Sequence, residues 1–311
     1  FGSTLLSLGN VFTTDSHRFD HLVIDEGGQC HAAYAVSGLM RCRRALIIGD
    51  VHQLEPVIQL SEDDERRVQR AAGIEGDPEW VRPYAIWERS GVSAQSVADR
   101  TMKNRPTLRS HFRCQPEIIN LSNALCGYGL EVHTEIRSRS EECPLLTAPV
   151  LLSAVDGEQQ RHRSSWFNGP ESQRVIAIVD TLVDSGIPFE DIAVITPYVG
   201  QLDTLRMGFR RAGFPMESDL DFDASDLIPG AGVGMGTVHR FQGGERSIVI
   251  LSTVATRERS LRFLNHRVNL VNVAISRARD HLIIVGDPKL LSKGAYSRIL
   301  VEGATPLKPP Q

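Results

Sequence analysis

The sequence lacks several features that would assign it to a class at once. Its longest apolar runs have the length of a strand, so we expect no transmembrane helix and no secretory signal. Its five cysteines form no CxxC pair and no Cys/His cluster with zinc spacing, and their number is odd. We therefore expect reduced thiols, no membrane association and a cytoplasmic location, or a nuclear one if the source is eukaryotic.

Lysine is also scarce, because only four of the 34 basic residues are lysines. Arginine suits bidentate contacts with phosphate, but such a bias equally reflects the composition of a genome. The net charge of −4 argues against binding a polyanion with the whole surface, and it leaves room for a local basic groove. The length of 311 residues is enough for two domains with ordinary hydrophobic cores.

The sequence is organised around residues 22–29, which read Leu-Val-Ile-Asp-Glu-Gly-Gly-Gln. Three apolar residues followed by Asp25 and Glu26 predict a short buried strand, which delivers two carboxylates to the ligand-binding carboxyl edge of an α/β sheet. One carboxylate there can hold Mg²⁺, and the other can orient a water for attack on a phosphoryl group. The alternative is an acidic strand end that caps the next helix.

A second buried strand, residues 45–48, ends in Gly-Asp-Val-His-Gln-Leu-Glu-Pro at 49–56. An acid, Asp50, again follows a strand. Gln53 lies three residues further on, where a glutamine is able to sense a γ-phosphate. The alternative is a polar turn with a solvated glutamine.

The rest of the chain alternates strands and helices, as parallel α/β sheets do. Residues 10–14 are predicted as a strand. The charged stretch 61–90 is predicted as a solvated helix followed by a loop that ends around Trp80 and Trp87. Pro116 opens a helix with one buried face. The other predicted elements are strands at 149–155, 192–195, 248–251 and 282–285, helices at 171–185, 200–212 and 268–279, an arginine-rich loop at 257–267 and a frayed tail at 306–311.

Six segments in one order resemble the motifs of superfamily 1 helicases, over about residues 10–300. The most similar group includes the nonsense-mediated-decay RNA helicase and senataxin. The segments are 25–29 (motif II), 49–56 (motif III), 111–116 (His-Phe-Arg-Cys-Gln-Pro, motif IV), 196–201 (Thr-Pro-Tyr with Gln201), 236–245 (motif V) and 272–279 (motif VI). Each motif alone has limited specificity, but six in order leave little room for coincidence.

The resemblance implies a fold of tandem RecA-like P-loop NTPase domains with mainly parallel sheets and ATP in the cleft between them. The expected first domain, 1–108, is incomplete at its N-terminus. A second domain at 109–303 and a tail at 304–311 follow.

The same resemblance implies roles for individual residues. Asp25 would hold Mg²⁺, Glu26 would position the attacking water, and Gln53 would contact the γ-phosphate. Arg113 and Arg277 would reach across the cleft as arginine fingers, although a lone arginine before a helix is more often a surface residue. The further expected nucleotide contacts are Gln29, Asp50, Glu245 and Gly243.

The expected partner is single-stranded DNA or RNA, with 5′→3′ movement implied only by the family group. The strand would touch Thr196 and Tyr198, near Thr237 and His239. Tyr198 would offer a ring for stacking, and the threonines would bond phosphates. The alternative is that Tyr198 packs against the sheet.

The main departure from the family is motif I, G-x-x-x-x-G-K-[ST], whose loop and lysine hold the phosphates. None of the four lysines is followed by Ser or Thr. We therefore expect an upstream segment or a partner chain to supply motif I, and we expect this chain alone to be inactive.

Two functions remain open at this point. The first is an ATP-dependent helicase or translocase, which the intact Asp25, Glu26, Arg113, Arg277 and Glu245 favour. The second is a catalytically inactive, helicase-derived module that binds nucleic acid or a protein, which the missing lysine favours. A metabolic P-loop kinase would leave motifs IV to VI unexplained.

Overall fold

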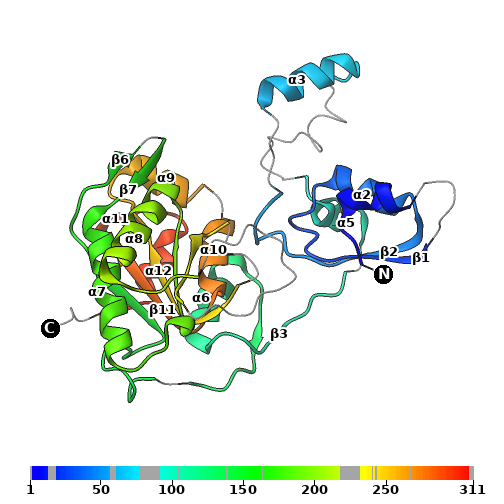
Figure 1. Ribbon diagram of the computed structural model, residues 1–311. Helices are drawn as coiled ribbons and strands as arrows, with labels where there is room; N and C mark the ends of the chain where they lie inside the picture. Colours follow the sequence, from blue (N-terminus) through cyan, green and yellow to red (C-terminus); the bar gives the residue numbers. More distant parts are fainter. Residues whose placement is uncertain are drawn as a thin grey trace. The chain divides into compact units, whose positions relative to one another are not determined.

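The computed structural model divides into two compact units, Phe1–Thr107 and Leu108–Gln311, which we describe separately (Figure 1). It describes all residues except 1, 13–18, 57–60, 77–91, 104, 138, 163, 218–231, 240, 242–243, 267 and 308–311. Trp80, Trp87 and Gly243 lie outside the described residues. The assignment of the two units to two RecA-like domains stays a prediction.

The first unit is built on a two-stranded parallel sheet in which Ile24 pairs with Ile47. Its elements are α1 (Leu5–Val11), β1 (Phe19–Ile24), α2 (Ala32–Leu39), β2 (Cys42–Ile47), α3 (Glu62–Ala71) and α5 (Ala94–Thr101). The small core joins Ile24 to Ala35 of α2 and Ala94 of α5.

The opposite face of this small sheet carries apolar side chains that the described residues leave uncovered. Val23, Leu46 and Ile48 are 60, 54 and 43% exposed. Parallel sheets normally have both faces covered. The first unit therefore lacks, within its described part, the layers that a parallel sheet requires.

The second unit has such layers. Its six-stranded sheet has the order β12-β5-β11-β10-β8-β9, and every pairing is parallel. The strands of this sheet are β5 (Val150–Ala154), β8 (Ile192–Thr196), β9 (Gly234–Thr237), β10 (Arg246–Ser252), β11 (Ala278–Gly286) and β12 (Thr305–Pro306). The short strands β3 (Ser110–His111) and β4 (Glu131–Val132) pair separately, and β6 (Gln160–His162) and β7 (Ser165–Phe167) form an antiparallel hairpin.

Helices pack along both faces of this sheet. The helices are α6 (Pro116–Cys126), α7 (Gly169–Asp184), η1 (Phe189–Asp191), α8 (Val199–Ala212), α9 (Glu258–Leu264), α10 (Val268–Ser276), α11 (Pro288–Leu291) and α12 (Ser297–Glu302). α7 packs beside α8, and α6 packs beside α10 and α12 (Figure 1). Ile248 and Ile250 of β10 join the α7 core, while Val249 and Leu251, which point the other way, are also fully buried. The predicted α/β fold with mainly parallel sheets is confirmed.

Four local predictions were wrong. Residues 10–14 do not form the predicted strand as far as they are described, because Asn10 and Val11 end α1, whose N-cap Thr4 accepts the N–H of Ser7. The arginine-rich segment is a helix, α9, rather than a loop. The predicted helix 268–279 ends at Ser276, and Ala278 already belongs to β11. Thr305 and Pro306, assigned to the tail, pair with β5.

No helix of the described part is long and apolar enough to cross a membrane. All five cysteines carry free thiols.

Candidate functional site

Motifs II and III meet at the carboxyl edge of the β1–β2 sheet. Beyond the paired strands, Ile48 N–H donates to Ile24 O at 2.8 Å, and Gly27 N–H donates to Ile48 O at 2.7 Å. A Cβ atom on Gly28 would clash with the backbone carbonyl of Asp50, and one on Gly27 would clash with Ile47. The two glycines therefore let the two motifs approach as closely as backbone allows.

The Glu26 carboxylate is oriented by its own turn. Glu26 has a φ of 52°, an uncommon conformation for a residue other than glycine. Its carbonyl accepts the N–H of Gln29 at 2.9 Å, and its Oε2 accepts the side-chain Nε2–H of Gln29, also at 2.9 Å. In this geometry Gln29 positions Glu26, in addition to any contact it makes with a nucleotide.

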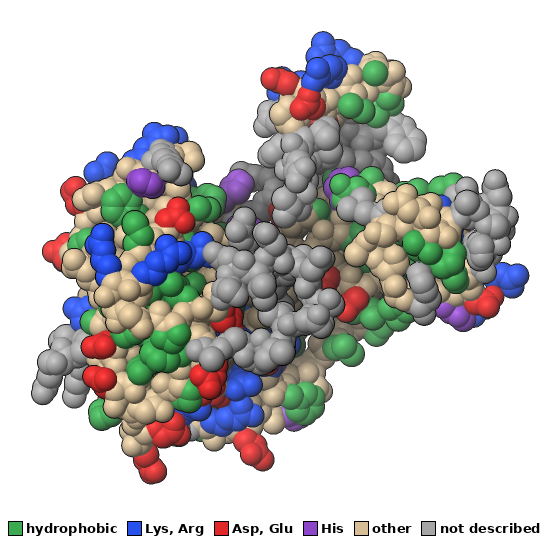
Figure 2. Space-filling model, in the orientation of Figure 1, with side chains coloured by type: hydrophobic (Ala, Val, Ile, Leu, Met, Phe, Trp, Pro, Cys, Tyr) green, Lys and Arg blue, Asp and Glu red, His purple; other side chains and the backbone are tan. Residues whose placement is uncertain are grey.

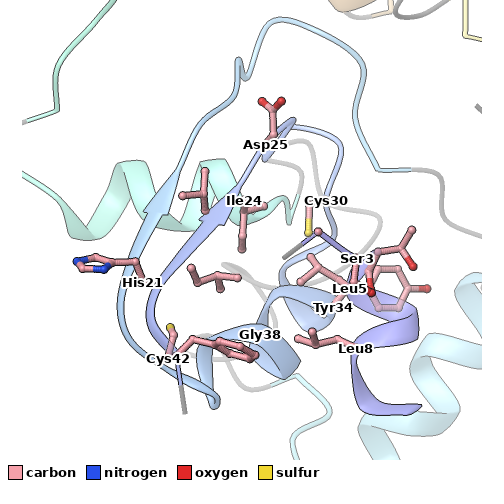
Figure 3. A pocket seen from close by; sticks show the side chains of 15 residues that line it. Ser3, Leu5, Leu8, His21, Ile24, Asp25, Cys30, Tyr34, Gly38 and Cys42 are labelled. Carbon is pink, nitrogen blue, oxygen red and sulfur yellow. The ribbon is translucent and has the colours of Figure 1, made fainter. Parts of the chain in front are cut away.

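Asp25 and Asp50 each fix their local backbone with one oxygen. Asp25 Oδ1 accepts the N–H of Glu26 at 2.9 Å, and Asp50 Oδ1 accepts the N–H of His52 at 2.8 Å. Gln53 closes the same turn, since its N–H donates to Asp50 O at 3.3 Å. Figure 3 shows the Asp25 carboxylate at the tip of β1, pointing away from the apolar side chains around it. The structure thus brings Asp25, Glu26, Gln29, Asp50 and Gln53 to one sheet edge.

The donor set at this edge fits part of a magnesium–nucleotide site. Asp25 is exposed and offers a carboxylate oxygen, and Mg²⁺ takes most other ligands from water and phosphates. Among the described residues no group of three or more His, Cys, Asp or Glu side chains forms an all-protein cage. The sequence has no G-x-x-x-x-G-K-[ST] loop. The edge therefore suits a metal that arrives with its phosphates, and it lacks the cradle for them.

In the second unit, motifs IV, V and VI meet at the amino edge of the large sheet. Arg113 Nε lies 2.7 Å from Glu245 Oε2. Arg277 Nη1 donates to Gly244 O at 3.2 Å, and Arg246 N–H donates to Arg277 O at 3.1 Å. Three predicted site residues that are far apart in sequence, Arg113, Glu245 and Arg277, are therefore brought together. Gly243, predicted beside them, lies outside the described residues.

The turn that carries Arg113 is flanked by two uncharged side chains, those of His111 and Cys114. His111 Nε2 accepts the N–H of Cys114 at 2.8 Å, which requires an unprotonated ring nitrogen. Burial, with the Arg113 charge as the smaller cause, lowers the pKa of His111 and keeps the ring neutral. Burial also raises the pKa of the Cys114 thiol to about 12, so this cysteine stays protonated and unreactive.

The two predicted arginine fingers differ in exposure. The Arg113 side chain is 49% exposed, so its guanidinium is available to a ligand. Arg277 is only 4% exposed, and its guanidinium donates to Val273 O and Gly244 O of its own unit. Its role as a finger stays a prediction.

The predicted nucleic-acid residues lie at the opposite, carboxyl edge of the sheet, where Thr196 of β8 pairs with Thr237 of β9. The side chains of the two threonines are not on the surface. Thr196 is fully buried, and its hydroxyl accepts the N–H of Tyr198 at 3.4 Å. Thr237 is 7% exposed, whereas His239 is exposed.

The predicted stacking role of Tyr198 does not fit this arrangement. The residue is 8% exposed, its hydroxyl donates to Ser260 O at 3.3 Å, and its ring centroid lies 5.1 Å from that of Phe263. Burial raises the pKa of the hydroxyl. Tyr198 packs against α9, so it offers almost no surface to a base.

Sequence reasoning missed a buried polar network at this edge. The fully buried Glu171 accepts the Ser252 hydroxyl at 2.7 Å and the N–H of Val254 at 2.9 Å, and Gln201 donates to Ser252 Oγ at 2.9 Å. Val254 has a φ of 63°, which is strained for a β-branched residue. The sequence does contain Asn168 followed three residues later by Glu171, a pattern typical of the start of a helix. This pattern predicts the helix but not that the Glu171 side chain is buried.

The Glu171 network predicts how the stability of the second unit depends on pH. Burial raises the pKa of Glu171 from 4.5 to about 7. The folded state therefore holds a proton that the unfolded chain has lost, so stability should fall as pH rises from about 4.5 to 7. The loss should be on the order of 3 kcal/mol and level off above pH 7.

Glu171→Gln should remove this fall, because glutamine does not ionise. Urea unfolding of both proteins between pH 4.5 and 8 measures it, with the exposed Glu190→Gln as the control. Parallel pH profiles for the unchanged protein and Glu171→Gln would contradict the assignment.

Comparison with known proteins defines the class. A family model described as "AAA domain" matches residues 93–289, and a second with the same description matches residues 2–61. The chain is 28% identical to the mouse 5′-3′ DNA helicase ZGRF1, and the match covers 89% of this chain and 13% of that protein.

Two proteins of the fruit fly Drosophila melanogaster also match this chain. Identity is 32% with the probable RNA helicase armi (96% of this chain, 26% of that protein) and 28% with the regulator of nonsense transcripts 1 homolog (89% and 21%). Among solved structures, the crystal structure of Arterivirus nonstructural protein 10 (helicase) matches with 13% identity and a TM-score of 0.43. That match covers 92% of this chain and 43% of the other.

The chain belongs to the AAA-domain family of superfamily 1 helicases. It spans only 13 to 26% of the length of these three relatives.

Proposed function

We propose that this chain is part of the motor core of an ATP-dependent helicase or translocase that moves on single-stranded DNA or RNA. The observation that carries the proposal is the meeting of Arg113, Glu245 and Arg277 at one edge of the second unit. Motifs IV, V and VI supply one residue each, and chance would not bring three such motifs together. The carboxylates Asp25 and Glu26 at one edge of the first unit support it further.

The two units carry, separately, the two kinds of group that phosphoryl transfer uses. In the proposed roles, Asp25 holds Mg²⁺, Glu26 orients the attacking water, and Gln53 contacts the γ-phosphate. Arg113 and Arg277 stabilise charge that develops on the transferred phosphoryl group. The metal, when bound, neutralises phosphate charge. Movement in the 5′→3′ direction is proposed from the helicase group alone.

We propose that an upstream segment or a partner chain carrying motif I completes the first unit. A cavity of about 650 Å³ lies along β1, between α1 and α2, and is lined mainly by apolar side chains such as Leu5, Leu8 and Ile24 (Figure 3). β1 pairs only with β2 in the described part of the chain. A further strand on the open edge of β1 would pair with its free backbone groups and border this cavity.

The alternative function, an inactive module that binds nucleic acid or a protein, has one observation in its favour, the absence of a phosphate-binding loop. It predicts no hydrolysis even after completion.

Arg113 gives the sharpest test of the proposed function, since it is half exposed and its loss leaves the part-exposed Glu245 hydrated. In a completed protein, Arg113→Gln should lower nucleic-acid-stimulated turnover by about 10³-fold, the lower end for an arginine finger. The Kd for ATP should change little. Arg109→Gln, an exposed arginine four residues earlier, is the control. Normal turnover in Arg113→Gln would contradict the proposed role, and no turnover in any completed form would favour the inactive module.

A further inference from the structure

The carboxyl edge of the second unit carries an exposed surface that none of the predicted motif residues forms. It is built from α9 and from the β6–β7 hairpin, and we call it the α9–hairpin surface. Its exposed and half-buried side chains are Arg161, Trp166, Arg257, Arg259, Arg262 and Phe263.

This surface is fixed to the core by buried polar groups. Gln159, 3% exposed, accepts the N–H of Thr256 at 3.1 Å and the hydroxyl of Ser260, and its own N–H donates to Thr256 Oγ1 at 3.0 Å. The Tyr198 hydroxyl donates to Ser260 O at 3.3 Å. The hairpin, α9 and the end of β8 therefore form one connected body.

This body carries both arginines and aromatic rings on its surface. The Arg161 guanidinium lies 6.0 Å from the centroid of the Trp166 ring, and Phe263 is 46% exposed beside buried Tyr198. Arg259 and Arg262 have no ion-pair partner among the described residues. Figure 2 shows Lys and Arg side chains at the end of the unit where Figure 1 places β6 and β7, as well as elsewhere on the same face.

Acidic side chains only partly offset this charge. Glu158 lies 3.8 Å from Arg257, with both side chains exposed, and Glu258 is exposed on α9. A surface that served solubility alone would not need a ring such as Phe263 half exposed beside the arginines. Arginines together with stacking rings are typical of surfaces that hold single strands.

We propose that the α9–hairpin surface binds single-stranded nucleic acid, with Arg259 and Arg262 on phosphates and Phe263 and Trp166 stacked on bases. The inference rests on the proposed function and moves the contact from Thr196 and Tyr198 to the elements that cover them. It also separates this contact from Arg113 and Arg277. Strand β10 spans seven residues between the two edges, which corresponds to about 20 Å.

The experiment measures binding of labelled 20-nucleotide oligothymidylate and oligouridylate to the chain Phe1–Gln311 across a range of salt concentrations. The double variant Arg259→Gln/Arg262→Gln should reduce the salt slope by about 1.4, since each contact with a single strand contributes about 0.7. Phe263→Leu should weaken binding about tenfold and leave the salt slope unchanged, because a stack on an uncharged ring releases no counterions.

The matched control is Arg210→Gln/Arg211→Gln, two exposed arginines in the last turn of α8. It should bind like the unchanged chain. A crosslinking oligonucleotide with 5-bromouracil gives a second readout that needs no variant, because it should label peptides containing residues 160–167 and 257–264.

Different results overturn different claims. If the unchanged chain binds but both α9 variants bind equally well and neither peptide is labelled, the inference is wrong and the proposed function stands. If the unchanged chain shows no salt-dependent binding, the inference is overturned, and the same result with the protein completed by motif I would overturn the proposed function as well. Loss in the α9 variants with crosslinks to these peptides supports the inference.

Discussion

Expressed alone, the chain Phe1–Gln311 should release no measurable phosphate from ATP, with or without single-stranded nucleic acid. The same protein completed by a segment that carries G-x-x-x-x-G-K-[ST] should turn over at about 1–10³ s⁻¹, the range of ordinary enzymes. The reason is that the short chain has no loop to position the phosphates of ATP. Asp25 can still hold a metal and Arg113 is still exposed, but nothing fixes the β- and γ-phosphates, and positioning provides most of this catalysis.

The assay compares steady-state phosphate release by the short chain, the completed protein, and the completed protein with its motif I lysine changed to alanine. The lysine variant should resemble the short chain. Robust turnover by the short chain that disappears in Glu26→Gln would refute the argument, because an unrecognised group would then replace the lysine. A silent completed protein would instead support the inactive module.

Glu26→Gln in the completed protein should have the second large effect. We expect hydrolysis to fall by about 10²–10⁴-fold while ATP and nucleic-acid binding persist. The variant removes the charge that orients the water and keeps the shape of the side chain. The amide can still accept the Nε2–H of Gln29, so the turn at Glu26 should stay intact.

A matched control lies on the same strand. Asp20→Asn changes an acid at the far end of β1 whose side chain is 78% exposed and lies 3.7 Å from Arg43. It should leave turnover unchanged. Near-normal turnover in Glu26→Gln would remove Glu26 from its role, and a loss of ATP affinity as large as the loss of rate would make it a binding residue.

The large sheet was predictable because its strands are buried on both faces. The apolar runs at 192–195, 248–251 and 282–285 correspond to β8, β10 and β11, and glycine marks the end of α8 as expected, with Gly213 in the left-handed region. Short apolar runs of this kind are typical of strands that are buried on both faces of a parallel sheet. The first unit was readable only in part. Strands precede the acids at β1 and β2 as predicted, but the prediction that they are buried was wrong, because most of their side chains are exposed in the described part of the chain.

α9 and the fate of Tyr198 were not predictable in this way. Four arginines in the segment 257–267 suggest a loop, yet Leu261 and Leu264 give α9 a buried side. Ser260 also donates to Gln159, which lies 101 residues earlier, just before the hairpin. Whether the Tyr198 ring faces solvent or is buried depends on α9, which packs against it. Burial of polar side chains is decided by tertiary neighbours, which local pattern does not encode.

The burial of Glu171 was likewise not predictable from the local sequence pattern. Charged residues are rarely buried without a charged partner, so an isolated glutamate at a helix start is read as exposed. Here four hydrogen-bond donors from Asn168, Ser252, Thr253 and Val254 face the carboxyl group. These donors come from two segments, the start of α7 itself and residues 252–254, and neither segment alone signals the burial.

The open edge of β1 has a consequence for how this chain behaves at high concentration. An unpaired strand edge beside exposed apolar side chains is a template for pairing with another copy, and charged residues on edge strands oppose such pairing. β2 carries the exposed Arg43 and Arg44, whereas Val23 stands on β1 with only Asp20 and His21 as polar neighbours on the strand. Pairing of the proposed upstream segment with β1 and pairing of a second copy with β1 would therefore compete for the same strand edge.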